Sequence, residues 1–254
     1  MKKILVLMVA ATFCYPVFAQ NTKGTAPAAG KANAHLKVYD QAVVTGDFNT
    51  AIVALNYYLN EQGSNNVYAD TLAMLYMQQG AYGQCYYWAD KRLQSKPDDN
   101  GLLEMKGLCL EKMQAPKEAI TVFEKLFSRT QSPYHAYKLM ELQYSIKRLA
   151  ECVATATAAE RLQFKPEYVM SYNVGEQVGR TYLQAGIFNI HGLALFDLDR
   201  RAEAKAYFER AVALDSGFAL ARQNLEAIRA MEANPNKEGV KTNATPGASP
   251  ANKN

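Results

Sequence analysis

Histidine, tryptophan and cysteine are scarce in this chain of 254 residues, which contains three histidines, one tryptophan and four cysteines. The histidines, His35, His135 and His191, lack the paired spacing of a metal site such as HExxH. The sequence also lacks a GxSxG nucleophile motif and a Walker phosphate loop. The composition therefore predicts no catalytic residues, no metal site and no cofactor, and hence a protein that is not an enzyme.

A strong excess of positive charge is also missing. The formal net charge of the full chain is +4, but the lysines of the two terminal segments account for it. Residues 35–233 contain 21 basic and 23 acidic residues. Because a nucleic-acid-binding domain usually carries a basic patch, this near-neutral body argues against nucleic acid as a partner.

The sequence has one long apolar run, and it lies at the amino terminus. Lys2-Lys3 precede the apolar segment 4–13, and Val17-Phe18-Ala19 offer small residues before a cleavage site. The run is shorter than the roughly 20 apolar residues that span a bilayer. The pattern predicts a signal peptide at 1–19, a mature chain without an integral membrane segment, and a periplasmic or secreted location.

Removal of such a signal leaves three cysteines, Cys85, Cys109 and Cys152, in a compartment where disulfides form. An odd number of cysteines cannot pair completely within one chain. Each lies in an apolar, helix-like stretch, which favours buried free thiols. The sequence leaves open whether any two of the three pair.

A period of 34 residues organises the body of the chain. A turn, then an aromatic residue or proline, then an apolar pair recurs at fixed spacing in the segments 46–52, 80–86 and 114–120. Periods of this length are typical of repeat proteins that stack small helical units. The implied repeat frames are 32–65, 66–99, 100–133, a copy near 133–166, and a last copy at 185–218.

The repeat resembles that of the tetratricopeptide repeat (TPR) family, in which each unit is a pair of antiparallel helices. That motif places a small residue at its eighth position, here Gly107 and Gly192. It places another at its twentieth position, here Ala51, Cys85, Ala119, Cys152 and Ala204. The resemblance implies an all-α, TPR-like α-solenoid of about five helix pairs over residues 35–233, in an exported bacterial TPR protein.

Four segments depart from the repeat. Residues 167–185 alternate apolar and polar side chains around Gly175, which predicts a small β-hairpin; the alternative is a loop or an extended neighbouring helix. Residues 218–233 keep helical spacing with one polar face, which predicts a helix that caps the solenoid. Small and polar residues dominate 20–34 and 234–254, which predicts a flexible linker and a disordered tail.

In TPR arrays the first helix of each repeat lines a concave groove, so the resemblance implies a binding site there. Transferred position by position, it selects nine candidate residues: Asp70, Met74, Met77, Glu104, Leu108, Tyr134, Tyr137, Glu141 and Tyr144. Acidic residues stand where some TPR domains clamp a terminal carboxylate, so the groove favours an apolar or basic segment instead. Tyr137 and Tyr144 are seven residues apart and share a helix face, which we expect to front the groove. The alternative is that such side chains only pack between repeats.

These observations predict a noncatalytic protein–protein interaction scaffold of the bacterial cell envelope, with a protein or peptide bound in its groove. The alternative is a peptide- or glycan-binding accessory subunit of an envelope enzyme. The identity of the partner, the process served and the oligomeric state do not follow from the sequence.

Overall fold

The computed structural model describes residues 34–233, which form eleven α-helices and one two-stranded sheet. The predicted signal peptide, linker residues 20–33 and the tail 234–254 lie outside this range. Ten helices form five consecutive pairs: α1 (Ala34–Thr45) and α2 (Phe48–Gln62), α3 (Val67–Gln78) and α4 (Tyr82–Leu93), α5 (Asn100–Lys112) and α6 (Pro116–Thr130), α7 (Pro133–Ser145) and α8 (Leu149–Ala159), and α9 (Leu183–Asp197) and α10 (Arg201–Leu214).

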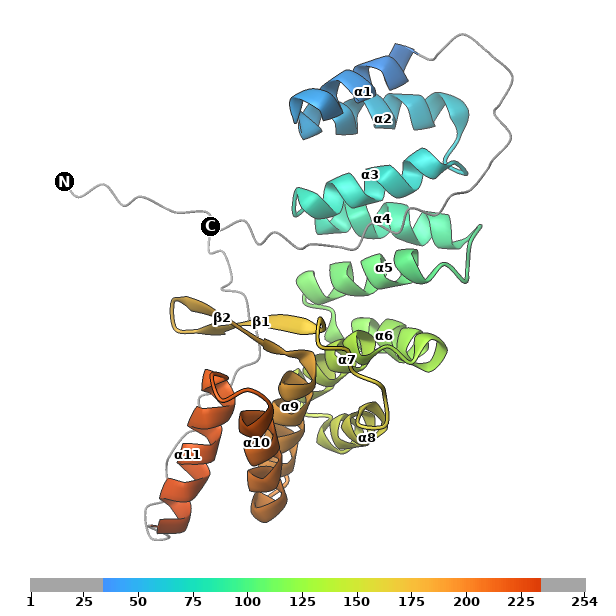
Figure 1. Ribbon diagram of the computed structural model, residues 1–254. Helices are drawn as coiled ribbons and strands as arrows, with labels where there is room; N and C mark the ends of the chain where they lie inside the picture. Colours follow the sequence, from blue (N-terminus) through green and yellow to red (C-terminus); the bar gives the residue numbers. More distant parts are fainter. Residues whose placement is uncertain (1–33, 234–254) are drawn as a thin grey trace, which may run out of the picture.

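Each helix packs against the next one along the chain, from α1 to α11 (Ala219–Ala233). Figure 1 shows α1 to α5 stacked in order, with the later helices continuing the array. The predicted all-α solenoid of five helix pairs is therefore confirmed. Between residues 34 and 233, none of the helices is both long and apolar enough to span a bilayer.

Small residues sit where the helices approach most closely. All five residues at the twentieth repeat position, from Ala51 to Ala204, are fully buried. A Cβ atom added to Gly107 would lie 2.8 Å from the ring of Phe123, and one added to Gly192 would lie 2.6 Å from the ring of Phe208. The repeat pattern thus places small residues where a larger side chain would push paired helices apart.

The turn inside each helix pair has the same backbone conformation in all five repeats. Its residue at the fifteenth repeat position has a positive φ: 72° at Gly46, 71° at Gly80, 60° at Gln114, 62° at Lys147 and 58° at Asp199. Glycine adopts this left-handed conformation freely, whereas other residues do so at a cost of about 1–2 kcal/mol. Only the first two repeats meet the requirement with glycine.

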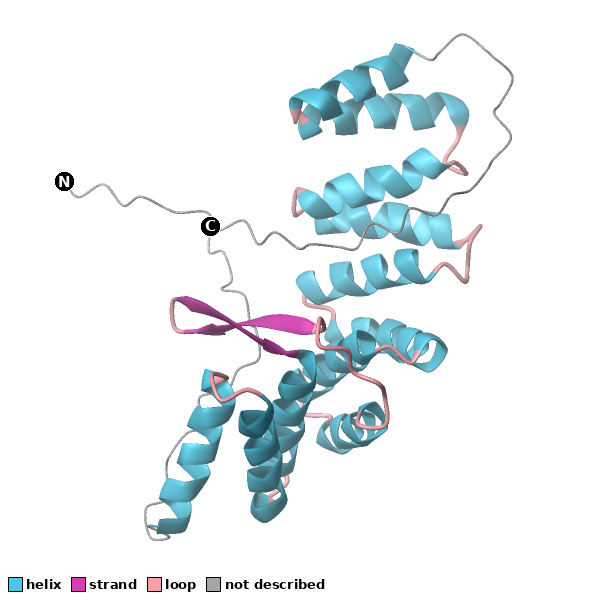
Figure 2. Cartoon of the chain, viewed as in Figure 1, coloured by secondary structure: helices cyan, strands magenta, loops and turns pink. Residues whose placement is uncertain are grey.

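The insertion between the fourth and fifth repeats is a β-hairpin, as the alternating pattern predicts. Strand β1 (Val169–Val174) pairs antiparallel with β2 (Gln177–Tyr182), and Gly175 starts the two-residue turn with a φ of 57°. The hairpin leads directly into α9, and its turn points away from the stacked helices (Figure 2). Its inner face carries Met170 and Tyr172, and the ring of Tyr172 packs edge-on against that of Phe218 at 4.8 Å between centroids.

Helix α9 is the most buried helix of the array. It contacts α7, α8, α10 and both strands, and every residue from Ala185 to Leu195 is buried. The predicted capping helix is α11, whose Leu225 and Ile228 join the same apolar cluster as the side chains of α9. The hairpin and α11 together close this end of the solenoid around its largest core.

Candidate functional site

The candidate site is the surface formed by the first helices of the first four repeats, α1, α3, α5 and α7, hereafter the first-helix face. The nine predicted residues differ widely in accessibility. Met74 on α3 is 46% exposed, whereas Tyr137 and Tyr144 on α7 are 8% and 7% exposed. The other six are partly buried: Asp70, Met77, Glu104, Leu108, Tyr134 and Glu141.

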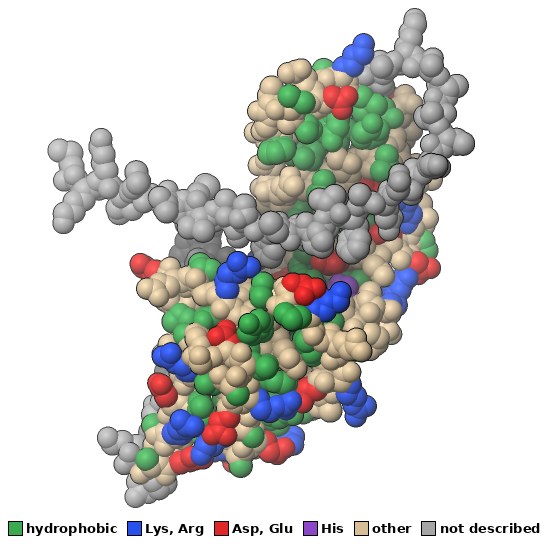
Figure 3. All heavy atoms as spheres, in the orientation of Figure 1, with side chains coloured by type: hydrophobic (Ala, Val, Ile, Leu, Met, Phe, Trp, Pro, Cys, Tyr) green, Lys and Arg blue, Asp and Glu red, His purple; other side chains and the backbone are tan. Residues whose placement is uncertain are grey.

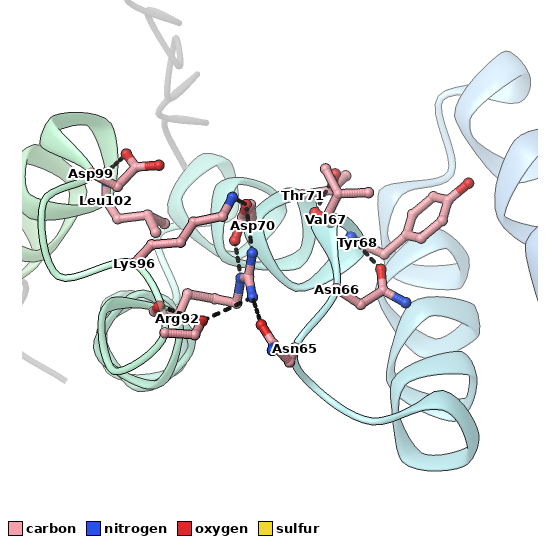
Figure 4. Close-up of polar contacts among 11 residues, drawn as sticks. Asn65, Asn66, Val67, Tyr68, Asp70, Thr71, Arg92, Lys96, Asp99 and Leu102 are labelled. Carbon is pink, nitrogen blue, oxygen red and sulfur yellow. Dashed lines mark hydrogen bonds and ion pairs between the residues drawn. The ribbon is translucent and has the colours of Figure 1, made fainter. Parts of the chain in front are cut away.

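Asp70 does not offer a free carboxylate, because two cations from α4 and the segment after it bind it. The guanidinium of Arg92 makes a two-point contact with Asp70, and the Nζ atom of Lys96 lies 3.1 Å from Oδ2 of Asp70. Arg92 also donates a hydrogen bond of 2.7 Å to Oδ1 of Asn65. Figure 4 shows these side chains converging on Asp70. Arg92 is only 3% exposed, so this cluster connects α3, α4 and the loop before α3.

Glu104 is also paired, in this case across a repeat boundary. Its Oε2 atom lies 3.3 Å from Nε2 of His135 on α7, and Nδ1 of His135 lies 2.7 Å from the hydroxyl oxygen of Thr130. His135 is 6% exposed. The histidine therefore bridges the end of α6, the start of α7 and α5, which is a structural role.

Lys138 on α7 forms ion pairs with two more carboxylates of the first-helix face. Its Nζ atom lies 3.0 Å from Oε1 of Glu111 and 2.9 Å from Oε2 of Glu141. Burial alone would lower the pKa of Lys138, but the carboxylates of Glu141 and Glu111 outweigh it and raise that pKa. Lys138 therefore stays charged and offsets part of the negative charge that the sequence places on this face.

The two tyrosines of α7 belong to the core in this structure. The hydroxyl of Tyr137 donates a hydrogen bond of 2.8 Å to Glu141, and Tyr144 hydrogen-bonds to Asp197. Burial, followed by the neighbouring carboxylates, raises the pKa of both hydroxyls. The expectation that the two rings front an open groove is thus not met.

The β-hairpin explains the burial of Tyr137. A Cβ atom added to Gly186 would lie 2.2 Å from Sδ of Met170 and 3.3 Å from the ring of Tyr137. Met170 of β1 therefore packs where α7 and α9 meet, at the same end of the first-helix face as Tyr137. The hairpin itself occupies the position that an external ligand would need in order to reach this ring.

Three residues that shape the face were not predicted from the sequence: Arg92, His135 and Lys138. The three-residue spacing of Lys138 and Glu141 on one helix was the available signal for the last of them. Arg92 and Asp70 are 22 residues apart and meet only after α3 and α4 pair. His135 and Glu104 are 31 residues apart and meet only after neighbouring repeats stack. No local pattern indicates such a contact.

Groups of three or more metal-binding side chains do not occur within residues 34–233. The most buried histidine, His191, has a structural setting like that of His135. Its Nδ1 atom lies 3.0 Å from Oε1 of Glu160, and its ring lies 3.9 Å from that of Tyr207 between centroids. Burial lowers the pKa of His191 despite the nearby carboxylate.

Exposed apolar side chains are concentrated in the first three helices. They include Val44 at 82%, Val67 at 64% and Met74 at 46% exposure, all on first helices of repeats. Figure 3 agrees, with hydrophobic side chains grouped over the N-terminal helices at the top and charged ones interspersed over the lower part. The accessible apolar part of the first-helix face therefore lies at its N-terminal end, on α1 and α3.

Comparison with known families identifies two matching segments. The sequence model of the tetratricopeptide repeat family matches residues 185–218. That of anaphase-promoting complex (cyclosome) subunit 3 matches residues 44–126. A search of curated proteins found no match.

Solved structures with a similar fold include YrrB, described as a TPR protein with an unusual peptide-binding site. It aligns with a TM-score of 0.58 at 14% identity, over 74% of this chain and 88% of its own. A MamA protein aligns with a TM-score of 0.58 at 17% identity, over 82% and 96% of the two chains. MamA from Desulfovibrio magneticus RS-1 gives 0.56 at 16% identity, over 73% and 95%. At these identities the likeness concerns the fold alone.

The stacked helix pairs, their small contact residues and their common turn define an α-solenoid of helical repeats. Within that class the fold is of the tetratricopeptide repeat type, because the TPR family model matches the fifth repeat and TPR structures share the fold.

Proposed function

We propose that this protein is a noncatalytic protein-interaction scaffold that binds a partner on the N-terminal half of its first-helix face. The observation that carries the proposal is the set of exposed apolar side chains on the first helices α1 and α3, with Met74 among the predicted contact residues. Large apolar side chains left in water favour contact with a partner that covers them.

The charge pairing on this face supports an apolar partner segment rather than a strongly basic one. Asp70, Glu104 and Glu141 each have a cationic or histidine partner within the chain, at distances of 3.3 Å or less. A basic ligand would have to displace these partners before it gained an ion pair. An apolar side chain placed against Met74 displaces only water.

The opposite end of the face is covered by the chain itself. Met170 packs beside Tyr137, and α9 has almost no exposed surface next to the hairpin. Tyr137 and Tyr144 then act by holding α7 in place, while the partner contacts α1, α3 and the accessible edge of α5.

We also propose that the protein acts in the cell envelope after export. The N-terminal lysines, the apolar run and the small residues before Gln20 support this location. Intact-mass analysis of the protein isolated from its native cells should give a chain that begins at Gln20. A chain that retains residues 1–19 would contradict export.

Substitution of Met74 tests the interaction surface. Met74→Asp places a charge in the apolar area and should reduce partner capture from envelope extract by about tenfold or more, which corresponds to about 1.4 kcal/mol. Val53→Asp is the matched control, because Val53 is 53% exposed but lies on the second helix α2. Capture is measured by affinity purification under reducing conditions and quantitative mass spectrometry.

Equal loss of capture in both variants would show that the effect is not specific to this face. Unchanged capture with Met74→Asp would exclude α3 as the contact. The structural likeness to a peptide-binding TPR protein, YrrB, favours a peptide ligand as the second candidate function. Retention of a peptide or glycan without an associated protein would support an accessory binding subunit instead.

A further inference from the structure

Two of the three cysteines in the described residues meet inside the solenoid. Cys85 lies on α4 and Cys109 on α5, and both are fully buried. The two helices pack against each other, and the two thiols are close enough to shift each other's pKa. Cys85 lies near the start of α4 and Cys109 near the end of α5, so these consecutive helices, which run in opposite directions, bring the two residues to the same level.

We propose that Cys85 and Cys109 form an intrachain disulfide that links the second repeat to the third, with a disulfide compound as the oxidant. The third thiol has a different setting. Cys152 on α8 is fully buried and donates a weak hydrogen bond of 3.6 Å to the carbonyl oxygen of Met140. It therefore has an oxygen neighbour rather than a second sulfur, and should stay reduced.

In the folded chain the contact between the thiols lowers the pKa of Cys109 and, together with burial, raises the pKa of Cys85. Thiolates rather than thiols attack disulfides. Because this pKa difference depends on the contact between the two thiols, either cysteine can be the first nucleophile while α4 and α5 are apart.

The reaction is a pair of thiol–disulfide exchanges. The Sγ atom of one of the two cysteines attacks one sulfur of the oxidant, which forms a mixed disulfide and releases the first thiolate. The Sγ atom of the other cysteine then attacks the protein sulfur of that mixed disulfide, and the second thiolate leaves as the protein disulfide forms. The two thiol protons end on the released thiols, so one oxidant disulfide is reduced to two thiols and the protein loses two hydrogens.

Both sulfur atoms are inaccessible in the folded chain, so the oxidant reaches them while α4 and α5 are apart, during folding or local opening. The bond then closes a loop of the chain between residues 85 and 109. Closing a loop of this size restricts the unfolded chain and stabilises the folded one.

Peptide mapping of the full chain tests the pairing. The protein is unfolded, refolded with a mixture of oxidised and reduced glutathione, quenched with acid, alkylated with N-ethylmaleimide under denaturing conditions and digested without reductant. The expected result is one dominant linked peptide that joins Cys85 to Cys109, with Cys152 alkylated. Separate alkylation of Cys85 and Cys109, glutathione attached to either, or equal linkage to Cys152 would overturn the proposal.

Thermal unfolding supplies a second measurement that uses matched variants. Dithiothreitol should lower the melting temperature of the oxidised wild-type chain by several degrees, and that of Cys152→Ala equally. It should leave the melting temperatures of Cys85→Ala and Cys109→Ala unchanged. A wild-type melting temperature that does not respond to dithiothreitol would contradict the disulfide. Because partner capture is measured under reducing conditions, failure here leaves the proposed interaction surface untouched.

Discussion

Helices α3 and α9 occupy the same position in their repeats, yet their surroundings differ greatly. Four of the twelve residues of α3 are buried, compared with twelve of the fifteen residues of α9. Helix α3 packs against α2, α4 and α5, whereas α9 is also covered by the β-hairpin and shares an apolar cluster with α11. The same repeat motif therefore yields an accessible helix at one end and a core helix at the other.

The difference teaches that motif position alone does not determine exposure. In an uninterrupted array the first helices keep one side free, as α3 does at Met74. The insertion at 169–182 places its own apolar side chains on that side in the last two repeats. A surface available for partners in one half of the molecule is thereby used for internal packing in the other half.

The largest expected effect concerns the glycines at the eighth repeat position. Gly192→Val should lower the free energy of unfolding by about 3 kcal/mol, because its Cβ would lie 2.6 Å from Phe208 within a fully surrounded helix. Gly107→Val should cost about 2 kcal/mol, since α5 has more freedom to shift away from Phe123. Urea unfolding followed by circular dichroism measures both. A larger loss of unfolding free energy in Gly107→Val than in Gly192→Val would contradict the expectation that α9 is packed more tightly than α5.

A single charged side chain on the inner face of the hairpin should weaken its packing against the helical repeats. Met170→Asp places a carboxylate against Gly186 and Tyr137 and should cost about 2 kcal/mol. Val169→Asp is the matched control on the outer face, where Val169 is 44% exposed, and should change stability by about 0.5 kcal/mol or less. Hydrogen exchange across 169–182 should rise only with Met170→Asp. Equal exchange in the two variants would show that the inner face does not anchor the hairpin.

Acid should weaken the C-terminal half through His191. Burial lowers the pKa of His191 from its ordinary value of 6.5, so the unfolded chain takes up a proton before the folded chain does. Stability is therefore retained above pH 6.5 and falls as the pH drops below it, by at most about 1.4 kcal/mol per pH unit for this group.

The comparison of wild type with His191→Gln isolates this contribution. Urea unfolding at pH 7.5 and 5.5 should show a smaller loss of stability in the variant than in the wild type. An equal loss in both would assign the acid sensitivity to other groups.

The smallest expected effects concern the turns inside the helix pairs. Gln114→Gly should raise the free energy of unfolding by about 0.5–1 kcal/mol, because glycine adopts the φ of 60° without strain. Gly46→Ala should lower it by about 1 kcal/mol, although nothing lies within 4 Å of the added Cβ. Thermal unfolding of the two variants checks the opposite signs. Equal signs would mean that the backbone conformation does not control the turns.

The fold could be predicted from the sequence because the patterns that determine it are short and recur along the chain. Gly107 and Ala119 stand at spacings that recur every 34 residues, and the period of two around Met170 indicated the strands. The face was harder to predict, since its nine residues were selected by position. Asp70 and Tyr137 could be placed on first helices but not assigned their partners, Arg92 and Met170, which come from other elements.

The sequence by itself determined the helix pairs, the small contact residues, the hairpin and the capping helix. Each depends on side-chain size or on periodicity within a short segment. The stacking of repeats on one another changes neither of these properties. Only the tertiary structure decided which acidic residues are neutralised, which tyrosines are buried and which two cysteines meet. Those outcomes depend on side chains brought together from different helices, and their physical origin is the close packing of neighbouring repeats around α9 and between α4 and α5.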